Sequence, residues 1–233
     1  MGKGYLGVFS SIMFLATTIW AETSIQAPKN QSSQHRGFLI ALSAPSGTGK
    51  STIAQKILAT DPELVRSVSV TTRPIRPGEI DGKDYFFVDR DRFLEMDKNN
   101  EFAEKSENYG NLYGISRKFI EEKVSSGKDI ILDLNWDGVQ QLAGSKNKYD
   151  VVTIFILPPS LKELEKRLRN RATDKEEAIL TRLSQAKSEI KHLVHYDYVV
   201  INDDIDKAKQ QVKTIIDAER LKRTRQILPN YED

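Results

Sequence analysis

The chain has 233 residues, which corresponds to one or two domains and suffices to bury a core without disulfides or a structural metal. Hydrophobic residues make up 39% and charged residues 29%, proportions typical of a folded globular protein. Cysteine is absent, which excludes a disulfide scaffold, a thiolate metal site and a cysteine nucleophile. The net charge of +2 argues against a globally basic nucleic-acid-binding protein, and three histidines argue against a histidine-rich metal site.

The N-terminal region is expected to lie outside the fold. Lys3 precedes an apolar run over residues 5–20, and the small residue Ala21 follows it. This pattern resembles a secretory signal, and the run is short for a membrane-spanning helix. Three explanations remain open for residues 1–21: a signal or anchor, a targeting peptide, or a start codon chosen too far upstream. Residues 5–20 are the only expected membrane contact, and residues 22–36 are interpreted as a linker.

Apolar runs and helical stretches alternate along the rest of the chain. The runs predict buried parallel strands, at residues 38–43, 129–134, 149–157 and 198–201. Helices are expected between them, at residues 51–59, 160–170, 176–193 and 204–226. The alternation predicts an α/β fold in which helices flank a parallel sheet.

One segment interrupts this alternation. It contains short strand-like pieces and a glycine-rich turn at residues 108–114. We therefore expect a domain over residues 37–226, with its core at 37–66 and 127–226 and an inserted subdomain at 67–126.

A phosphate-binding loop is predicted between the first strand and the first helix. Residues 44–51 match G-x-x-x-x-G-K-[ST] at every fixed position except the first, where Ala44 stands. Backbone N–H groups of such a loop bind phosphate oxygens, and Gly47 and Gly49 permit a close approach. Lys50 is expected to contact the β- and γ-phosphates of a nucleotide. The Ser51 hydroxyl is expected to bind Mg²⁺, with Asp133 as the supporting acid.

A second segment, residues 67–87, is dense in groups that bind phosphate. Arg73 and Arg76 lie three positions apart, and Tyr85 follows them. Guanidinium groups bind phosphate bidentately, so these side chains together can bind one phosphate dianion. A solvated charged loop is the alternative for the two arginines taken alone.

Several ordered motifs over about residues 38–216 resemble those of guanylate kinases. The most specific is S-x-x-x-T-T-R-x-x-R-x-G-E-x-x-G-x-x-Y, which begins at Ser67. Others are E-F-A-E at 101–104, G-N-L-Y-G at 110–114, I-L-D-L-N at 131–135, R-L-R-N-R-A-T-D at 167–174, R-L at 182–183 and V-I-N-D at 200–203. The resemblance implies a P-loop kinase core, a GMP-binding α+β subdomain at 67–126 and a helical lid at about 168–180. It also implies ATP-dependent, Mg²⁺-requiring phosphorylation of GMP to GDP.

The resemblance assigns residues to each nucleotide. The ATP-binding residues would be Ala44, Pro45, Ser46, Gly47, Thr48, Gly49, Lys50, Ser51, Thr52 and Asn202, the last beside adenine. The GMP-binding residues would be Ser69, Arg73, Arg76, Tyr85, Glu104, Tyr113, Asp133 and Asn135. Of these, Arg73, Arg76, Tyr85 and Tyr113 would hold the phosphate, and Ser69 and Glu104 would select guanine.

Asn135 departs from the family pattern, which has an aspartate that helps to select guanine. An amide is uncharged and also donates hydrogen bonds. Two outcomes therefore remain open: relaxed selection of guanine, or a carbonyl that accepts the same bond.

The implied catalytic residues are all basic: Lys50, Arg73, Arg167, Arg171 and Arg182. Phosphoryl transfer spreads charge over equatorial oxygens, so positioned cations supply much of the catalysis. For Arg167 the alternative is an ordinary helix ion pair with Glu163, four residues earlier. Ala172 replaces a glycine usual after the second lid arginine, which is expected to stiffen the lid hinge.

Two rival functions remain open beside a GMP-specific kinase. One is a nucleoside monophosphate kinase of relaxed purine specificity, which Asn135 motivates. The other is a non-catalytic guanylate-kinase-like binding module, which is disfavoured because the phosphate-binding residues are all present in the sequence. The need for ATP favours a cytoplasmic enzyme, with a membrane-tethered or organellar one as the alternative.

Overall fold

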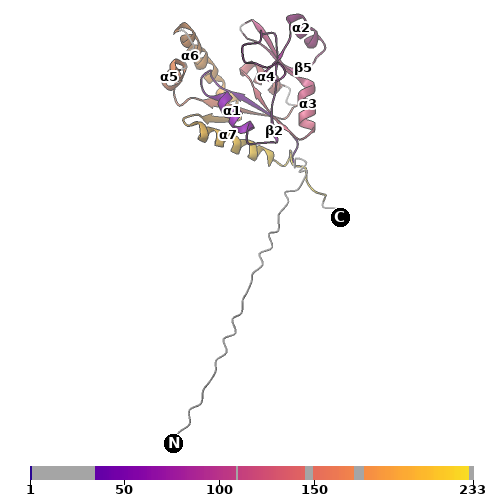
Figure 1. Cartoon of the computed structure of the whole chain (residues 1–233), viewed down its shortest axis with the longest axis vertical. Helices are drawn as coiled ribbons and strands as arrows, with labels where there is room; N and C mark the ends of the chain where they lie inside the picture. Colours follow the sequence, from indigo (N-terminus) through magenta and orange to yellow (C-terminus); the bar gives the residue numbers. More distant parts are fainter. Residues whose placement is uncertain (2–34, 109, 145–148, 171–175, 231–233) are drawn as a thin grey trace. The chain divides into compact units, whose positions relative to one another are not determined.

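The computed structural model describes Met1 and residues 35–108, 110–144, 149–170 and 176–230 (Figure 1). The predicted hydrophobic segment and most of the linker lie outside these residues, as do Arg171 and Ala172. None of the helices in the described part combines the length and apolarity that crossing a bilayer requires.

A five-stranded parallel sheet forms the centre of the fold, in the order β2-β7-β1-β8-β9. Its strands are β1 (Leu39–Ser43), β2 (Leu64–Arg66), β7 (Asp129–Asp133), β8 (Val151–Leu157) and β9 (Tyr198–Ile201). All five residues of β1 are buried, as its unbroken apolar sequence requires of a central strand. The parallel sheet flanked by helices confirms the predicted α/β class, whereas the three-residue edge strand β2 was not predicted.

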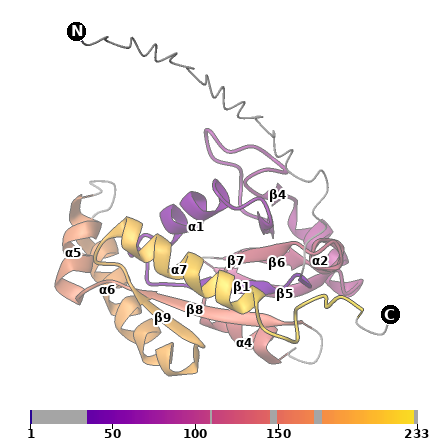
Figure 2. The same ribbon diagram turned by 90° about the horizontal axis from the view of Figure 1, so that it is seen from below.

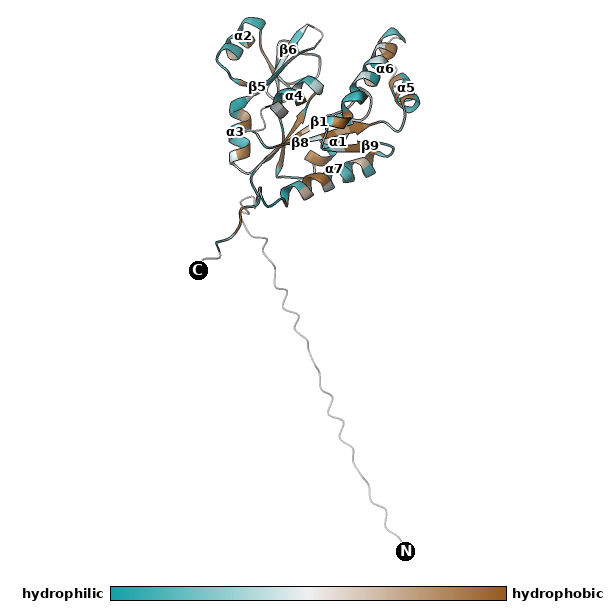
Figure 3. Ribbon diagram, turned by 180° about the vertical axis from the view of Figure 1, so that it is seen from behind, coloured by the Kyte–Doolittle hydropathy of each residue, from teal (hydrophilic) through white to brown (hydrophobic). Residues whose placement is uncertain are grey.

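Two helices cover each face of this sheet. On one face α1 (Lys50–Leu58) and α7 (Ile205–Arg220) lie side by side, and on the other lie α3 (Arg117–Ser125) and α4 (Trp136–Gly144) (Figures 1 and 2). Alternate residues of β1 serve the two cores: Ile40 and Leu42 face α1 and α7, while Leu39 and Ala41 face α3 and α4. Figure 3 shows hydrophobic colour along the sheet strands, with mixed colour on the helices.

The segment predicted as a subdomain has a sheet of its own, in the order β4-β3-β6-β5. Its elements are β3 (Val70–Thr71), β4 (Phe86–Phe87), α2 (Arg90–Lys98), β5 (Phe102–Asn108) and β6 (Asn111–Ser116). The predicted glycine-rich turn at 108–114 is wrong for most of its length. Gly110 has a φ of 74°, but β6 already begins at the next residue. Gly114 lies within β6, where a Cβ would come within 2.6 Å of the Phe102 ring, so close packing rather than turning requires that glycine.

The remaining helices follow β8. They are α5 (Leu161–Asn170), α6 (Glu176–Ile190) and the 3₁₀-helix η1 (Lys191–His195), so the helix predicted to reach 193 changes type after Ile190. The helix predicted to reach 226 ends at Arg220. Beyond it the chain folds back, and the buried Arg225 donates to both carboxylate oxygens of Asp150, at 2.5 and 2.7 Å. Gln226 forms an isolated β-bridge with His35, so the predicted helix does not continue to this residue.

Candidate active site

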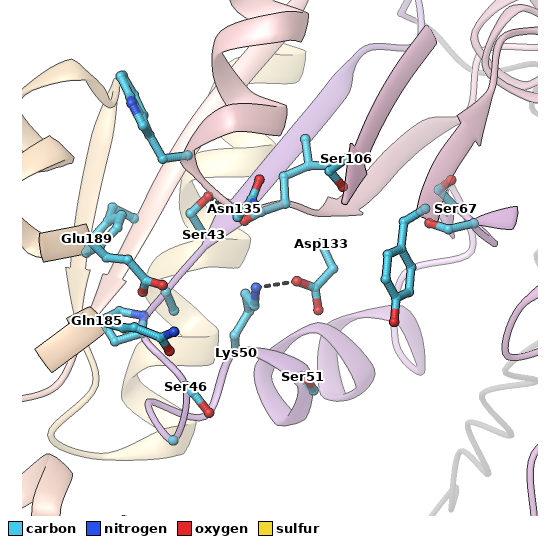
Figure 4. A pocket seen from close by; sticks show the side chains of 18 of the residues that line it. Ser43, Ser46, Lys50, Ser51, Ser67, Ser106, Asp133, Asn135, Gln185 and Glu189 are labelled. Atoms are coloured by element: carbon cyan, nitrogen blue, oxygen red, sulfur yellow. Dashed lines mark hydrogen bonds and ion pairs between the residues drawn. The ribbon is translucent and has the colours of Figure 1, made fainter. Parts of the chain in front are cut away.

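A cavity of about 740 Å³ opens at the carboxyl ends of the parallel strands. From the predicted phosphate-binding loop, every residue from Ala44 to Ser51 except Thr48 lines it, as does Thr52. The other predicted residues that line it are Ser69, Tyr85, Glu104, Tyr113, Asp133, Asn135 and Arg182. Figure 4 shows Lys50 and Asp133 joined by an ion pair, with Gln185 and Glu189 of α6 on one side of them and Ser67 on the other.

The loop after β1 requires glycine at two positions. Gly47 and Gly49 have φ values of 95° and 99°, which side chains with a Cβ rarely adopt. Each is also packed: a Cβ would lie 2.8 Å from Leu168 Cδ2 at Gly47 and 2.6 Å from Asn202 Nδ2 at Gly49. Asn100 is the only non-glycine residue of the described part with a positive φ. The Ala44 methyl therefore carries no backbone penalty, which explains why this departure from the motif is tolerated.

Asn202 supports the loop from behind. Its side chain is buried, and its Nδ2 donates to the Thr48 carbonyl at 2.6 Å. Arg167 in turn donates from its terminal nitrogen to the Asn202 carbonyl at 3.0 Å and from Nε to Glu163 at 3.2 Å. Neither Asn202 nor Arg167 lines the cavity. Contact of Asn202 with adenine and catalysis by Arg167 remain predictions.

Lys50 begins α1 and forms an ion pair with Asp133 at the end of β7. Residues Leu42 and Asp133 are register partners in the neighbouring strands β1 and β7, which brings the acid to the mouth of the loop. Ser51 is the next residue of α1, so its hydroxyl shares the cavity with the Asp133 carboxylate. A hydroxyl and a carboxylate are oxygen donors that suit Mg²⁺, which commonly uses one or two protein ligands together with phosphates and water. The residues present therefore fit the predicted metal.

Glu104 is the most unusual group in the cavity wall. It is 3% exposed, and its Oε1 has no hydrogen-bond partner among the residues that the structure describes. Burial raises its pKa to about 7, against an opposing hydrogen bond with Ser106. Gly138 of α4 makes room for it, because a Cβ there would lie 2.7 Å from Oε1. Because this buried carboxyl lines the cavity and one of its oxygens accepts no hydrogen bond from the described residues, it is suited to a ligand with N–H donors.

Asn135 lines the cavity beside Glu104 and caps α4. Its Oδ1 accepts a hydrogen bond from the Gly138 backbone N–H at 2.9 Å. The amide oxygen therefore has a structural partner, and the Nδ2 donor is the group that remains for a ligand.

The two arginines of the predicted phosphate site do not line the cavity. Arg73 donates to Glu79 at 2.6 Å and to the Pro74 carbonyl at 2.8 Å, and its guanidinium lies over the Tyr85 ring. Arg76 is exposed. Tyr85 and Tyr113 do line the cavity, with ring centroids 6.1 Å apart.

Helix α6 closes another wall of the cavity. Arg182 donates to the Ser46 hydroxyl at 2.6 Å, which ties the helix to the phosphate-binding loop. Gln185 and Glu189 also line the cavity, and burial raises the pKa of Glu189 above its usual value, although the charge of Lys50 opposes this rise. Sequence reasoning missed both residues. Their spacing of three and seven positions from Arg182 places them on one helical face, which was the available signal.

Aromatic packing joins α6 to the same region. The Trp136 ring, at the start of α4, stacks on His192 at 4.6 Å and on His195 at 5.0 Å. Both histidines lie in η1, directly after α6, and Trp136 lines the cavity. The stack thus connects α4 with η1, which continues from α6.

Comparison with known proteins identifies this arrangement. Residues 36–219 match the sequence model of the guanylate kinase family. The chain belongs to the guanylate kinase family. Curated guanylate kinases of Novosphingobium aromaticivorans and Zymomonas mobilis are each 52% identical to it, over 82% of this chain and 86% and 88% of theirs. The crystal structure of a guanylate kinase from Anaplasma phagocytophilum, 40% identical, aligns with a TM-score of 0.67 over 82% of this chain and 90% of that one.

These findings confirm the resemblance inferred from the motifs. They also favour an enzyme over a non-catalytic binding module, because the alignments cover most of the length of relatives that are named guanylate kinases.

Proposed function

We propose that this protein transfers the γ-phosphoryl group of ATP to GMP, giving ADP and GDP. One observation carries the proposal: the phosphate-binding loop and the buried, unpartnered Glu104 carboxyl line the same cavity. A nucleotide donor and a guanine acceptor can therefore occupy it together.

Glu104 would read the guanine base. Guanine presents an N1–H and a 2-amino group as adjacent donors, and a carboxylate can accept from both. This contact would supply the partner that Oε1 lacks among the described residues. Ser69, which also lines the cavity, would add a hydroxyl contact to the base.

The donor phosphates would lie on the loop after β1. Backbone N–H groups there and the Lys50 ammonium would bind the phosphates, while Ser51 and Asp133 would hold Mg²⁺. Mg²⁺ held there would neutralise charge on the donor phosphates. An oxygen of the GMP phosphate would attack the γ-phosphorus as the bond to the ADP oxygen breaks. No protein base is needed, because the acceptor is already an anion and its positioning does the work.

Cations must surround the transferred group as its charge spreads. Arg182 already lines the cavity, and Arg73, Arg76 and Tyr85 would bind the acceptor phosphate after the subdomain closes over it. Arg171 is proposed for the same role and lies outside the described residues. Reliance on ATP favours a cytoplasmic location.

Asn135 favours a second candidate, a kinase that also accepts other purine nucleotides. Its oxygen is engaged with Gly138, and its free Nδ2 donates rather than accepts. It therefore offers little to the 2-amino group that distinguishes GMP from IMP. Turnover of IMP within tenfold of GMP turnover supports this candidate, and a larger gap contradicts it.

The experiment that tests the main proposal compares two lysines of α1. We expect Lys50→Met to lower GMP-dependent ADP formation at least a hundredfold, because Lys50 would bind the transferred phosphate. Lys56→Met is the matched control: Lys56 pairs with Asp206 at 2.8 Å and does not line the cavity. Absence of GMP turnover by the wild-type chain, or equal activity of the two variants, contradicts the proposal.

A further inference from the structure

The cavity contains a cation that neither the sequence motifs nor the proposed mechanism uses. Its basic lining residues are Lys50, Arg66 and Arg182. Lys50 pairs with Asp133, and Arg182 donates to Ser46. Arg66 has no hydrogen bond or ion pair with any residue in the described ranges. Arg66 is exposed and lines the cavity, so its guanidinium donors are available to a ligand there.

Arg66 occupies a rigid position. It is the last residue of β2, and its register partner is Ile131 of β7. The next residue, Ser67, continues this pairing by donating its backbone N–H to the Ile131 carbonyl at 3.1 Å. Arg66 thus belongs to the parallel sheet in which β7 ends at Asp133, and not to the separate sheet of the subdomain.

Arg66 lies between the phosphate-binding loop and Tyr85. It also lines a small adjoining cavity of about 20 Å³ together with Lys50, Ser51 and Asp133. Burial and the charge of Asp133 raise the pKa of Tyr85, and the charges of Arg66 and Arg73 act against that rise, so both arginines lie within electrostatic range of the tyrosine. Sheet order places β2 two strands from β1, about 10 Å from the strand that enters the loop. Arg66 is therefore displaced from the donor phosphates toward Tyr85.

Its neighbour provides a second, independent observation. Ser67 lines the same cavity, and its Oγ is buried without a hydrogen-bond partner among the residues that the structure describes. Two consecutive residues of the cavity wall thus have donors without a partner in the described part of the chain, a hydroxyl and a guanidinium, both of which can bind an anion.

We propose that Arg66, supported by the Ser67 hydroxyl, binds the phosphate of the acceptor nucleotide from the side that faces Lys50. This inference rests on the proposed function and adds a residue to it. Arg73 is paired with Glu79 and Arg76 lies outside the cavity, so Arg66 is the cation that meets the incoming phosphate first. It would hold the acceptor in line with the donor before the subdomain closes.

The test measures how each substrate responds to loss of the guanidinium. We expect Arg66→Gln to raise the KM for GMP about tenfold, the loss of one charge-assisted hydrogen bond, with the KM for ATP unchanged. The inhibition constant of guanosine, which has no phosphate, is expected to stay within twofold, which also shows that the variant is folded. Arg66→Lys is expected to restore part of the loss, because an ammonium keeps the charge and loses the bidentate geometry.

Arg223→Gln is the control, since Arg223 is an exposed arginine that does not line the cavity. An unchanged KM for GMP in Arg66→Gln overturns the inference, as does a rise confined to the KM for ATP or an equal rise in guanosine inhibition. These results leave the proposed function standing if the wild-type chain phosphorylates GMP. If it does not, the proposed function itself fails.

Discussion

Glu104 lies in the cavity wall with 3% of its surface exposed, and burial raises its pKa to about 7. The folded state therefore binds this proton more tightly than the unfolded chain, whose carboxyl has a pKa near 4.5. The stabilising contribution of Glu104 to the free energy of unfolding is therefore largest below pH 4.5, and it is lost as the pH rises through about 7. Guanine binding needs the opposite form, because only the carboxylate accepts two hydrogen bonds from guanine.

A pH dependence of GMP binding follows. We expect the dissociation constant of GMP to fall as the pH rises from 6 to 8, with release of up to about one proton on binding near pH 6.5. Calorimetry in buffers of different ionisation enthalpy measures both quantities. Glu104→Gln is expected to bind GMP more weakly and to lose this pH dependence. The exposed Glu107→Gln, on the same strand, is expected to keep it; a wild-type profile in Glu104→Gln contradicts the assignment.

Asn135 sets the second prediction for single residues. Asn135→Asp restores a carboxylate beside Glu104, and aspartate caps a helix as well as asparagine does. We expect the ratio of kcat/KM for GMP to that for IMP to rise about tenfold, since the new carboxylate accepts from the 2-amino group. Steady-state assays with the two acceptors measure it. An unchanged ratio would show that the side chain at this position does not contact the base.

At the scale of elements, the loop after β1 depends on β9. Asn202 follows that strand, and its buried amide donates to the Thr48 carbonyl. We expect Asn202→Ala to lower the free energy of unfolding by about 1–3 kcal/mol, because a buried acceptor loses its donor, and to raise the KM for ATP more than that for GMP. Denaturant unfolding and steady-state kinetics check the two effects. Asp203→Asn, at the exposed next position, is expected to change neither the stability nor the KM for ATP. An unchanged KM for ATP in Asn202→Ala contradicts the claim that Asn202 positions the loop.

Three of the predicted strands, β1, β7 and β8, share one property: nearly all their residues are buried, on both faces of the sheet. Strand β8 is an unbroken apolar run for this reason. Helix α2 was missed because Phe93 is its only buried residue, so it has no hydrophobic stripe. Strand β5 was missed because its Phe-Ala-Glu-Lys-Ser-Glu-Asn sequence has charged residues on both faces, and one of them, Glu104, is buried.

The candidate site divides in the same way. The phosphate-binding motif located the loop, because binding phosphate requires those residue types at that spacing, and the resemblance to guanylate kinases located Glu104. Arg66, Gln185 and Glu189 come from elements whose sequence does not mark them. They reach the cavity through sheet order and helix phase, which depend on tertiary structure.

At the scale of the molecule, one buried ion network joins distant parts of the chain. Asp129 is fully buried at the start of β7; its Oδ1 lies 2.9 Å from His35 Nε2, and its Oδ2 accepts from Arg220 Nε at 2.6 Å. Arg220 also donates to Asp61 at 2.8 Å. The network thus connects the start of the domain, at His35, with α7 and with β7 of the sheet.

Removing its central acid takes away one of the two close carboxylate partners of the largely buried Arg220 guanidinium and leaves Asp61 as the other. We expect Asp129→Ala to lower the free energy of unfolding by about 3 kcal/mol, measured by urea denaturation. Glu95→Ala removes an exposed partner of Arg92, and we expect its effect on the free energy of unfolding to be too small to measure. Equal stability of these two variants would contradict a structural role for the network.

The central claim is that the cavity binds GMP as phosphoryl acceptor, and competition between acceptors tests it most directly. The full chain would receive limiting ATP with Mg²⁺ and equimolar GMP, IMP, AMP, UMP and CMP, and mass spectrometry would identify the diphosphates formed. We predict GDP as the main product, with IDP as the only other new diphosphate besides ADP. A mixture from which GDP is absent, or in which pyrimidine diphosphates equal it, would contradict the account.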